Sequence, residues 1–294
     1  MILSIGEILA DMVGTKNDSG FSFQSFCGGA PFNVAVNAKK QNAKVGFIGC
    51  VGKDVIGKFL LEESKKAHLD DLDIQEDDKR NTTLAFVSLT NGERDFTFHR
   101  YQTADYHIRF DKIDFSKYSD LKIIHLGSLM LSERHGRVLA KKVTKKSKAL
   151  GALLSFDVNF RSDTYKDFNQ AKSSYKYFIK NADIIKFSEE ELRNYSGFDT
   201  IKEGIESIYR KNQLFLVTLG AQGSMYYYNG DMEIVPTEKL KPVDTTGAGD
   251  AFFGAFLAKI EGKAWTKKNI RNAITEANLQ GALATQFMGA IKLS

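Results

Sequence analysis

Strands alternate with helices through the middle of this 294-residue chain, and this alternation limits its possible folds more than any other feature. Short apolar runs have the length of buried strands, and the segments between them have helical spacing. Such alternation predicts an α/β fold, in which helices cover both faces of a parallel sheet. The expected strands are 2–5, 123–126, 153–156, 184–185 and 214–218, and the expected helices are 55–67, 133–150, 167–180, 189–195, 201–212 and 268–287.

The composition is that of a soluble globular enzyme, with 43% hydrophobic and 26% charged residues. The net charge of +5 is mild, and the lysine clusters fall on expected helix faces, where they are solvated surface. We therefore expect no nucleic-acid partner. No run approaches the roughly 20 apolar residues of a membrane span, and the first residues lack a signal-peptide pattern, so we expect a cytoplasmic protein without membrane contact. Cys27 and Cys50 are expected to be reduced, buried thiols.

A glycine-rich turn near the C-terminus is the strongest chemical motif. Gly247-Ala-Gly249 precedes an apolar run with helical spacing, which predicts a helix N-terminus and therefore an anion site. Asp250 stands in the first turn of that helix, where a carboxylate is often only a cap or dipole partner. An anion site beside a base is also what phosphoryl transfer to an alcohol requires. The spacing matches neither a Walker A loop nor a dinucleotide-binding fingerprint.

Two motifs about 215 residues apart resemble one family. The segment from Asp244 to Phe252 resembles the C-terminal signature of the ribokinase-like (PfkB-type) carbohydrate kinases. The segment Gly28-Gly-Ala-Pro-Phe-Asn33 resembles their N-terminal signature in its fructokinase form. The resemblance implies a single ribokinase-like three-layer domain over 1–294, with a mostly parallel central sheet flanked by helices. It also implies a small β-strand lid formed by about 13–27 and 84–107, with Asn91-Gly92 as a hairpin turn.

The resemblance also implies roles for individual residues. It makes Asp250 the catalytic base and the amides of Gly247, Ala248 and Gly249 the anion hole. The residues implied for the sugar are Asp11, Gly28, Gly29, Asn33, Arg100, Asn159 and Arg161. Those implied for the nucleotide are Lys186, Ser188, Thr218, Gly220, Gly223 and Asn278. Glu191 is implied to organise Mg²⁺ through water, and Asp244 and Thr246 to lie within reach of K⁺, although the residues themselves do not establish a K⁺ requirement.

Plainer structural roles remain open for several of these residues. Asp11 also fits a turn, Asn33 fits a helix cap, and Arg100 fits a solvated charge on an edge strand. Ser188 stands where the wider family has Asn, and it also fits an N-cap before an acidic first turn. A Gly220-x-x-Gly223 turn before a hairpin is a weak nucleotide signal by itself.

The function that these patterns favour is an ATP-dependent sugar kinase, with Mg²⁺ as cofactor and D-fructose as acceptor. A 2-keto-3-deoxygluconate kinase is the alternative within the class, and ribose or a sugar phosphate is less favoured. From other classes, a catalytically inactive sugar-sensing protein remains open, whereas the missing N-terminal fingerprint disfavours a dinucleotide-dependent enzyme. Exposed strand edges tend to be covered, so we expect a homodimer through the lid.

Overall fold

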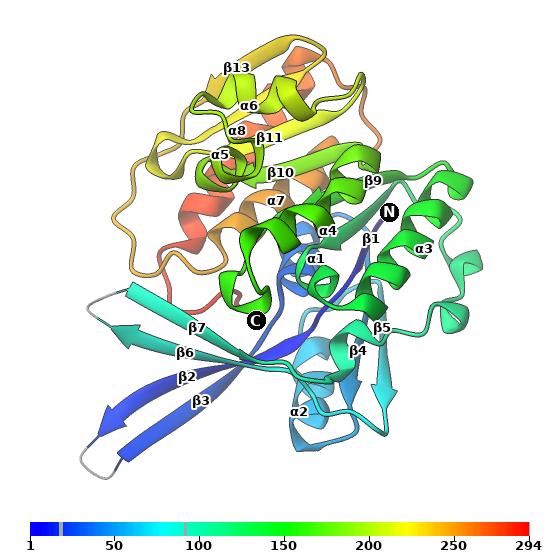
Figure 1. Ribbon diagram of the computed structural model, residues 1–294, viewed down its shortest axis with the longest axis vertical. Helices are drawn as coiled ribbons and strands as arrows, with labels where there is room; N and C mark the ends of the chain where they lie inside the picture. Colours follow the sequence, from blue (N-terminus) through cyan, green and yellow to red (C-terminus); the bar gives the residue numbers. More distant parts are fainter. Residues whose placement is uncertain (18–19, 91–92, 294) are drawn as a thin grey trace.

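The computed structural model describes residues 1–17, 20–90 and 93–293. Within these ranges, nine strands form one sheet in the order β13-β12-β11-β10-β9-β8-β1-β4-β5 (Figure 1). The seven strands β11-β10-β9-β8-β1-β4-β5 all pair in parallel with one another. At the other end of the sheet, β12 pairs antiparallel with β11, and β13 pairs antiparallel with β12. Their bounds are β1 (Ile2–Ile5), β4 (Val45–Gly52), β5 (Asp71–Asp77), β8 (Ile123–Gly127), β9 (Leu153–Asp157), β10 (Ile184–Ser188), β11 (Leu214–Thr218), β12 (Ser224–Tyr228) and β13 (Asp231–Val235).

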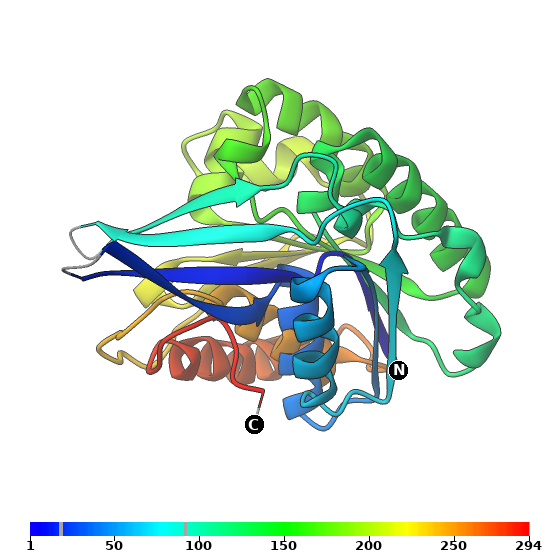
Figure 2. The ribbon, with the colours of Figure 1, turned by 90° about the horizontal axis from the view of Figure 1, so that it is seen from below.

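Helices cover both faces of this sheet, as the alternation predicts, and Figure 2 shows the two layers above and below it. One layer consists of α3 (Arg134–Leu150), α4 (Phe168–Asn181), α5 (Glu189–Ser196) and α6 (Ile201–Ile208). The other consists of α1 (Ala30–Lys40), α2 (Val55–Lys65), α7 (Ala248–Ile260) and α8 (Lys267–Ala284). The parallel strands are thereby buried on both sides, which is usual for parallel sheets.

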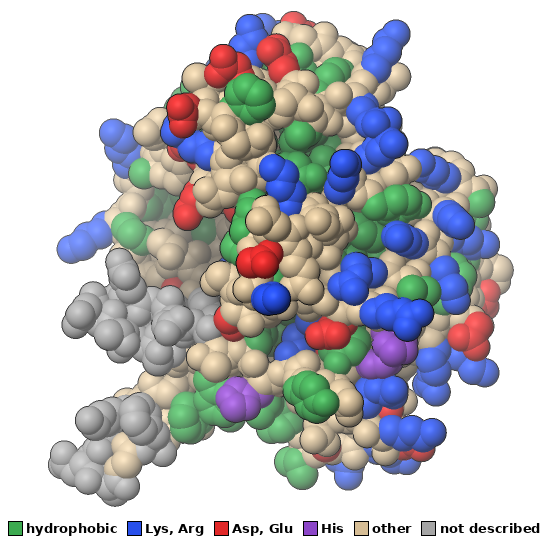
Figure 3. Space-filling model, in the orientation of Figure 1, with side chains coloured by type: hydrophobic (Ala, Val, Ile, Leu, Met, Phe, Trp, Pro, Cys, Tyr) green, Lys and Arg blue, Asp and Glu red, His purple; other side chains and the backbone are tan. Residues whose placement is uncertain are grey.

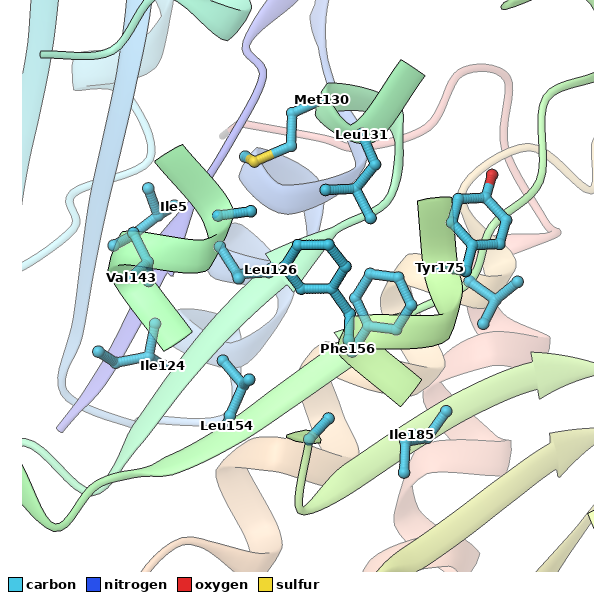
Figure 4. Close-up of a cluster of buried hydrophobic side chains, with 14 of the residues drawn as sticks. Ile5, Ile124, Leu126, Met130, Leu131, Val143, Leu154, Phe156, Tyr175 and Ile185 are labelled. Atoms are coloured by element: carbon cyan, nitrogen blue, oxygen red, sulfur yellow. The ribbon is translucent and has the colours of Figure 1, made fainter. Parts of the chain in front are cut away.

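Alternate residues of the central strands enter two separate apolar clusters because side chains alternate along a strand. Ile184 packs with the layer that contains α7, and Ile185 packs with the layer that contains α4. In the cluster on the side of α4, Phe156 of β9 lies between Leu126 and Tyr175 (Figure 4). These close-packed clusters hold the strands, and therefore the loops at their carboxyl ends, in fixed positions.

A second, smaller sheet extends away from the main body (Figure 1). Over the described residues it contains four strands in the order β3-β2-β6-β7. Strand β2 pairs antiparallel with β3 and parallel with β6, and β6 pairs antiparallel with β7. After β7 the chain returns to the main body, where the Ala104 N–H donates to the Asn81 carbonyl at 3.0 Å. The bounds are β2 (Leu9–Asn17), β3 (Gly20–Gly28), β6 (Leu84–Thr90) and β7 (Glu93–His99).

The helices expected at 201–212 and 268–287 end well before their expected residues, for reasons that lie in their tertiary contacts. The helix expected at 201–212 ends at Ile208, where Asn212 adopts a φ of 70° and its N–H donates to Asn229. The helix expected to reach 287 ends at Ala284, because the Thr285 carbonyl accepts hydrogen bonds from residues 243 and 244. The predicted Asn91-Gly92 turn lies outside the described residues.

The surface of the main body agrees with the expectation for the lysine clusters. Lys141, Lys142, Lys145 and Lys148 are exposed on α3, and basic side chains are spread over this face (Figure 3). Both cysteines are free and buried, as predicted. In the described part of the chain, no helix is both long and apolar enough to cross a membrane.

Candidate active site

The glycine-rich turn opens helix α7, as the sequence predicts. Gly247 caps the helix with a φ of 76°, and a Cβ there would lie 2.3 Å from the Ala290 carbonyl oxygen. The Asp244 carboxylate accepts hydrogen bonds from the N–H groups of Thr246 at 3.0 Å and Gly289 at 2.8 Å. The turn is therefore held against the C-terminal segment. The N–H groups of the first turn of α7 and the positive end of its helix dipole lie at the same place.

Asp250 lies in the first turn of α7 and is only 9% exposed. Its Oδ2 accepts a hydrogen bond of 2.8 Å from the Asn33 side-chain amide, which comes from the first turn of α1. Burial raises the pKa of Asp250, while the Asn33 hydrogen bond and the charges of Lys186 and Arg161 oppose that rise. Asp250 is thus oriented by a second helix and placed in a low-dielectric site, which suits a general base.

The turn lines two cavities of different size and character. Thr245, Ala248 and Gly249 border a cavity of about 450 Å³, whose volume suits an organic ligand. Gly247 and Asp250 border a second cavity of about 60 Å³. A group bound in the larger cavity therefore approaches Asp250 across the helix N-terminus. This end of a parallel sheet, beyond the strand carboxyl termini, is where ligands of open α/β folds bind.

Most of the residues predicted to bind sugar line the smaller cavity. Asp11 of β2 borders it, and a Cβ on Gly28 would lie 2.2 Å from the Asp11 Oδ2, so that glycine leaves room for the carboxylate. Gly29, with a φ of 112°, packs against the backbone of residue 7. Asn159, at a φ of 28°, and Arg161 follow β9 and complete the group. Their proximity is a structural fact, and their contacts with sugar stay predictions.

Glu7 lines the same cavity, and our sequence reasoning missed it. Glu7 lies closer to the carboxyl end of β1 than Asp11 does. An acidic residue at that end of a strand was the sequence signal that could have identified it. The residue is only 2% exposed, and burial raises its pKa to about 7, although its backbone hydrogen bond and the charge of Arg100 oppose that rise. The cavity therefore contains a carboxyl group that titrates near neutral pH.

Arg100 lies beside this cavity rather than in its wall. Its Nε donates to Asp105 at 2.8 Å and its Nη1 to Ser132 at 2.6 Å, and the side chain is buried. The alternative of a solvated edge-strand charge is therefore wrong, because β7 ends at His99 and the guanidinium is paired inside the protein. Arg100 borders a neighbouring cavity of about 520 Å³, and its contact with sugar stays a prediction.

Lys186 is buried beside the glycine turn and forms an ion pair with Asp157. The two distances from its Nζ to the carboxylate oxygens are 2.9 and 3.0 Å, and a Cβ on Gly249 would lie 3.4 Å from Nζ. Burial alone would lower the pKa of Lys186, but the carboxylates of Asp157, Glu191 and Asp250 together outweigh burial, and the pKa is raised. A positive charge therefore lies close to the N-terminus of α7, although the sequence did not indicate its partner.

Glu191 and Ser188 form a capping box at the start of α5, which confirms the structural alternative for Ser188. The two carboxylate oxygens of Glu191 accept N–H groups from Phe160 and Ser188, each at 2.7 Å. Across the described residues no three His, Cys, Asp or Glu side chains are grouped to hold a metal ion. Because both Glu191 oxygens are engaged by backbone N–H groups, this residue would reach a cation only through water, and Mg²⁺ normally keeps several waters and few protein ligands.

The larger cavity contains most of the residues predicted for the nucleotide. Thr218 ends β11, and Gly220 and Gly223 line the cavity with φ values of 57° and 99°. Asn278 of α8 also lines it, but its amide already bonds to Ser224 and to the carbonyls of residues 235 and 236. Asn278 therefore braces the cavity wall. Ser188 borders an adjoining hollow together with Thr218.

A family model for pfkB family carbohydrate kinases matches residues 1–294. The chain belongs to this family. Among curated proteins, the chain is similar to probable fructokinase-2 of Arabidopsis thaliana, with 36% identity covering 99% of this chain and 92% of that protein.

Solved structures of fructokinases agree with the fold. A fructokinase from Xylella fastidiosa with bound ATP superposes with a TM-score of 0.90, at 29% identity over 98% of this chain and 93% of that one. A fructokinase from Vibrio cholerae in a fructose-, ADP- and calcium-bound form has a TM-score of 0.88, at 31% identity over 98% and 94% of the two chains. The predicted ribokinase-like fold is therefore confirmed.

The pfkB membership accounts for both motifs from which the site was predicted, and the structure brings them together. Asn33 and Asp250 are 217 residues apart in sequence and share a hydrogen bond. The sequence did not reveal this bond, nor the ion pair between Asp157 and Lys186. Both interactions depend on tertiary packing, so the sequence indicated only that polar residues stand after strand ends and not which residues they pair with.

Proposed function

We propose that this protein transfers the γ-phosphoryl group of ATP to a hydroxymethyl group of D-fructose, giving fructose 6-phosphate. The observation that carries the proposal is the turn at 244–250, which borders both the nucleotide-sized cavity and the cavity that holds Asp250. The two reactants then meet at one helix N-terminus. Membership of the pfkB family and likeness to fructokinases that bind fructose, ATP or ADP support the same reaction.

The transfer follows from the groups at this turn. Asp250 removes the proton of the sugar hydroxyl as its oxygen bonds to the γ-phosphorus, and the bond to the β,γ-bridging oxygen breaks to release ADP. The amides of Gly247 and Gly249 stabilise the charge on the transferred group. The N–H of Ala248 belongs to the same turn, but it already donates to the Thr245 carbonyl at 3.3 Å. Its hydrogen bond to the transferred group would therefore be shared with that carbonyl. Lys186 adds a fixed positive charge nearby.

Two cations belong to the proposal. Mg²⁺ would neutralise the charge of the phosphates. Glu191 would hold it through water, because both carboxylate oxygens already accept backbone N–H groups. K⁺ would lie near Asp244 and Thr246, where the carboxylate braces the turn. A cation at that place would strengthen the anion hole through its charge.

The further parts of the proposal concern sugar, location and assembly. Fructose is preferred because the cavity wall contains several carboxylates and Arg161, which suits a neutral polyol more than an acid. A 2-keto-3-deoxygluconate kinase is the alternative within the family, and an inactive sugar sensor is the alternative outside catalysis. We also propose that the protein is cytoplasmic and acts as one domain, with the small sheet as a lid that excludes water and pairs in a homodimer.

The test is ADP release from Mg-ATP with fructose, 2-keto-3-deoxygluconate, ribose, mannose, adenosine and fructose 6-phosphate. Activity confined to fructose is the expected result. Activity confined to the keto-acid sugar would replace the acceptor and keep the mechanism. Absence of ADP release with every sugar, together with measurable fructose binding, would support the sensing alternative and overturn the kinase proposal.

A further inference from the structure

Two buried polar atoms in the wall of the small cavity lack a hydrogen-bond partner. They are Glu7 Oε2 and Asn33 Oδ1, and their residues are 2% and 4% exposed. A buried polar group without a partner loses its hydrogen bonds to water and gains none in return, so native proteins rarely retain one without a reason. Asn33 Oδ1 is a hydrogen-bond acceptor, because the amide nitrogen of Asn33 holds Asp250, and Glu7 Oε2 is an acceptor when the carboxyl group is ionised. The cavity therefore lacks hydrogen-bond donors at two places in its wall.

We infer that Glu7 is a substrate-binding residue, whose carboxylate accepts a hydrogen bond from a hydroxyl group of the acceptor sugar. A polyol brings several O–H donors into the cavity and satisfies acceptors that the protein leaves open. The backbone supports this role, because only Gly6 separates Glu7 from the carboxyl end of β1, and the Glu7 carbonyl packs against Gly29. This inference deepens the proposed function and rests on it.

The same position makes Glu7 a determinant of specificity. Glu7, Asp11 and Asp250 place three carboxyl groups around one small cavity, and Arg161 is the basic residue that borders it in the described structure. Asp250 and Asp105 add negative potential at Glu7, whereas Arg100 reduces it. An acceptor that carries its own carboxylate brings a like charge and further acceptors where donors are needed. Glu7 therefore favours a neutral sugar over a sugar acid.

The first test compares Glu7→Gln with Glu62→Gln, which makes the same change on the exposed surface of α2. Loss of a charge-assisted hydrogen bond is expected to raise the KM for fructose about 10- to 100-fold, with little change in kcat or in the KM for ATP. Glu62→Gln is expected to behave as the wild type. An unchanged KM for fructose in Glu7→Gln would overturn the inference.

The second test asks which hydroxyl Glu7 binds, using fructose analogues that each lack one hydroxyl. In the wild type, one analogue should lose about tenfold or more in kcat/KM. In Glu7→Ala the same analogue and fructose should react alike, because their common contact is already gone. If instead every analogue lowers kcat/KM by the same factor in Glu7→Ala as in the wild type, Glu7 contacts no hydroxyl and the inference fails. The ratio of kcat/KM for fructose to that for 2-keto-3-deoxygluconate should also fall in Glu7→Gln, and an unchanged ratio contradicts the specificity role.

Fructose binding without ATP separates this inference from the proposed function. It is measured by isothermal titration calorimetry on the wild type and on Glu7→Gln. If the wild type binds fructose more tightly than the variant but phosphorylates no sugar, the kinase proposal fails and the Glu7 contact stands. If the wild type phosphorylates fructose and both proteins bind it equally, the kinase proposal stands and the Glu7 contact fails. If neither protein binds or phosphorylates fructose, both fail.

Discussion

At the scale of single residues, Glu7 connects ligand binding with stability. Its buried carboxyl group lacks a partner at Oε2, and burial raises its pKa from 4.5 to about 7. An acid with a raised pKa binds protons more tightly in the folded protein than in the unfolded chain. Its effect is therefore destabilising above the folded pKa and disappears below the unfolded pKa. A residue that weakens the fold at neutral pH is expected to have a functional reason to be there.

This argument predicts how Glu7→Gln changes stability with pH. The wild type should lose stability relative to the variant as pH rises from about 4.5 to about 7, and the difference should then level off. A pKa shift of this size corresponds to a difference on the order of 3 kcal/mol. Urea unfolding of both proteins at pH 4.5, 6 and 8 measures it. A difference that is independent of pH would show that Glu7 has an ordinary pKa.

At the scale of elements, the site is assembled from strand ends and two helix N-termini. Asp157 ends β9, Lys186 lies in β10, and their ion pair is buried beneath the first turn of α7. Such a pair contributes less by attraction than its disruption costs, because a single buried charge remains when one partner is removed. The pair therefore fixes where a positive charge faces the glycine turn.

We predict that Asp157→Asn destabilises the protein by about 3–5 kcal/mol, because Lys186 loses its countercharge in a buried site. The free energy of unfolding in urea is the measurement. Glu189→Gln is the matched control, because Glu189 pairs with Arg193 on the exposed surface and such pairs contribute only about 0.3–0.5 kcal/mol. Equal effects of the two substitutions would mean that Lys186 finds another partner or loses its proton.

The elements also show how far sequence reasoning reaches. Apolar spacing predicts the central strands and the helices around them, since both patterns are local. The glycine motif predicts the start of α7, and its chemistry predicts Asp250. The ends of α6 and α8 depend on contacts with Asn229 and Asp244, which are distant in sequence. Glu7 was missed, and the burial and ion pair of Arg100 were not foreseen, for a related reason, because burial and partners follow from tertiary packing.

At the scale of the whole molecule, the small sheet projects from the main body (Figure 1). Strands β3 and β7 are its edges, and Phe23 on β3 is 46% exposed. A projecting sheet with an exposed aromatic side chain on its edge strand β3 favours association with another copy. These features support the proposed homodimer.

Light scattering at micromolar concentration should therefore give twice the mass of the 32.9 kDa chain. Phe23→Asp should shift the protein towards the monomer, because it places a charge on the proposed interface. Phe198→Asp is the control, since Phe198 is similarly exposed, at 44%, but lies in the loop after α5. A monomeric wild type would contradict the homodimer, and equal effects of the two variants would move the interface elsewhere.

The central claim is that Asp250 and the glycine turn transfer phosphoryl groups to a sugar. The most direct measurement is kcat with fructose and Mg-ATP for Asp250→Asn, together with ATP affinity by calorimetry on the same preparation. We predict that kcat falls about 10²- to 10⁴-fold, as expected for loss of a general base, while ATP affinity changes little. Asn33 retains a hydrogen-bond partner in this variant, so the turn should stay in place. Turnover equal to that of the wild type would contradict the account.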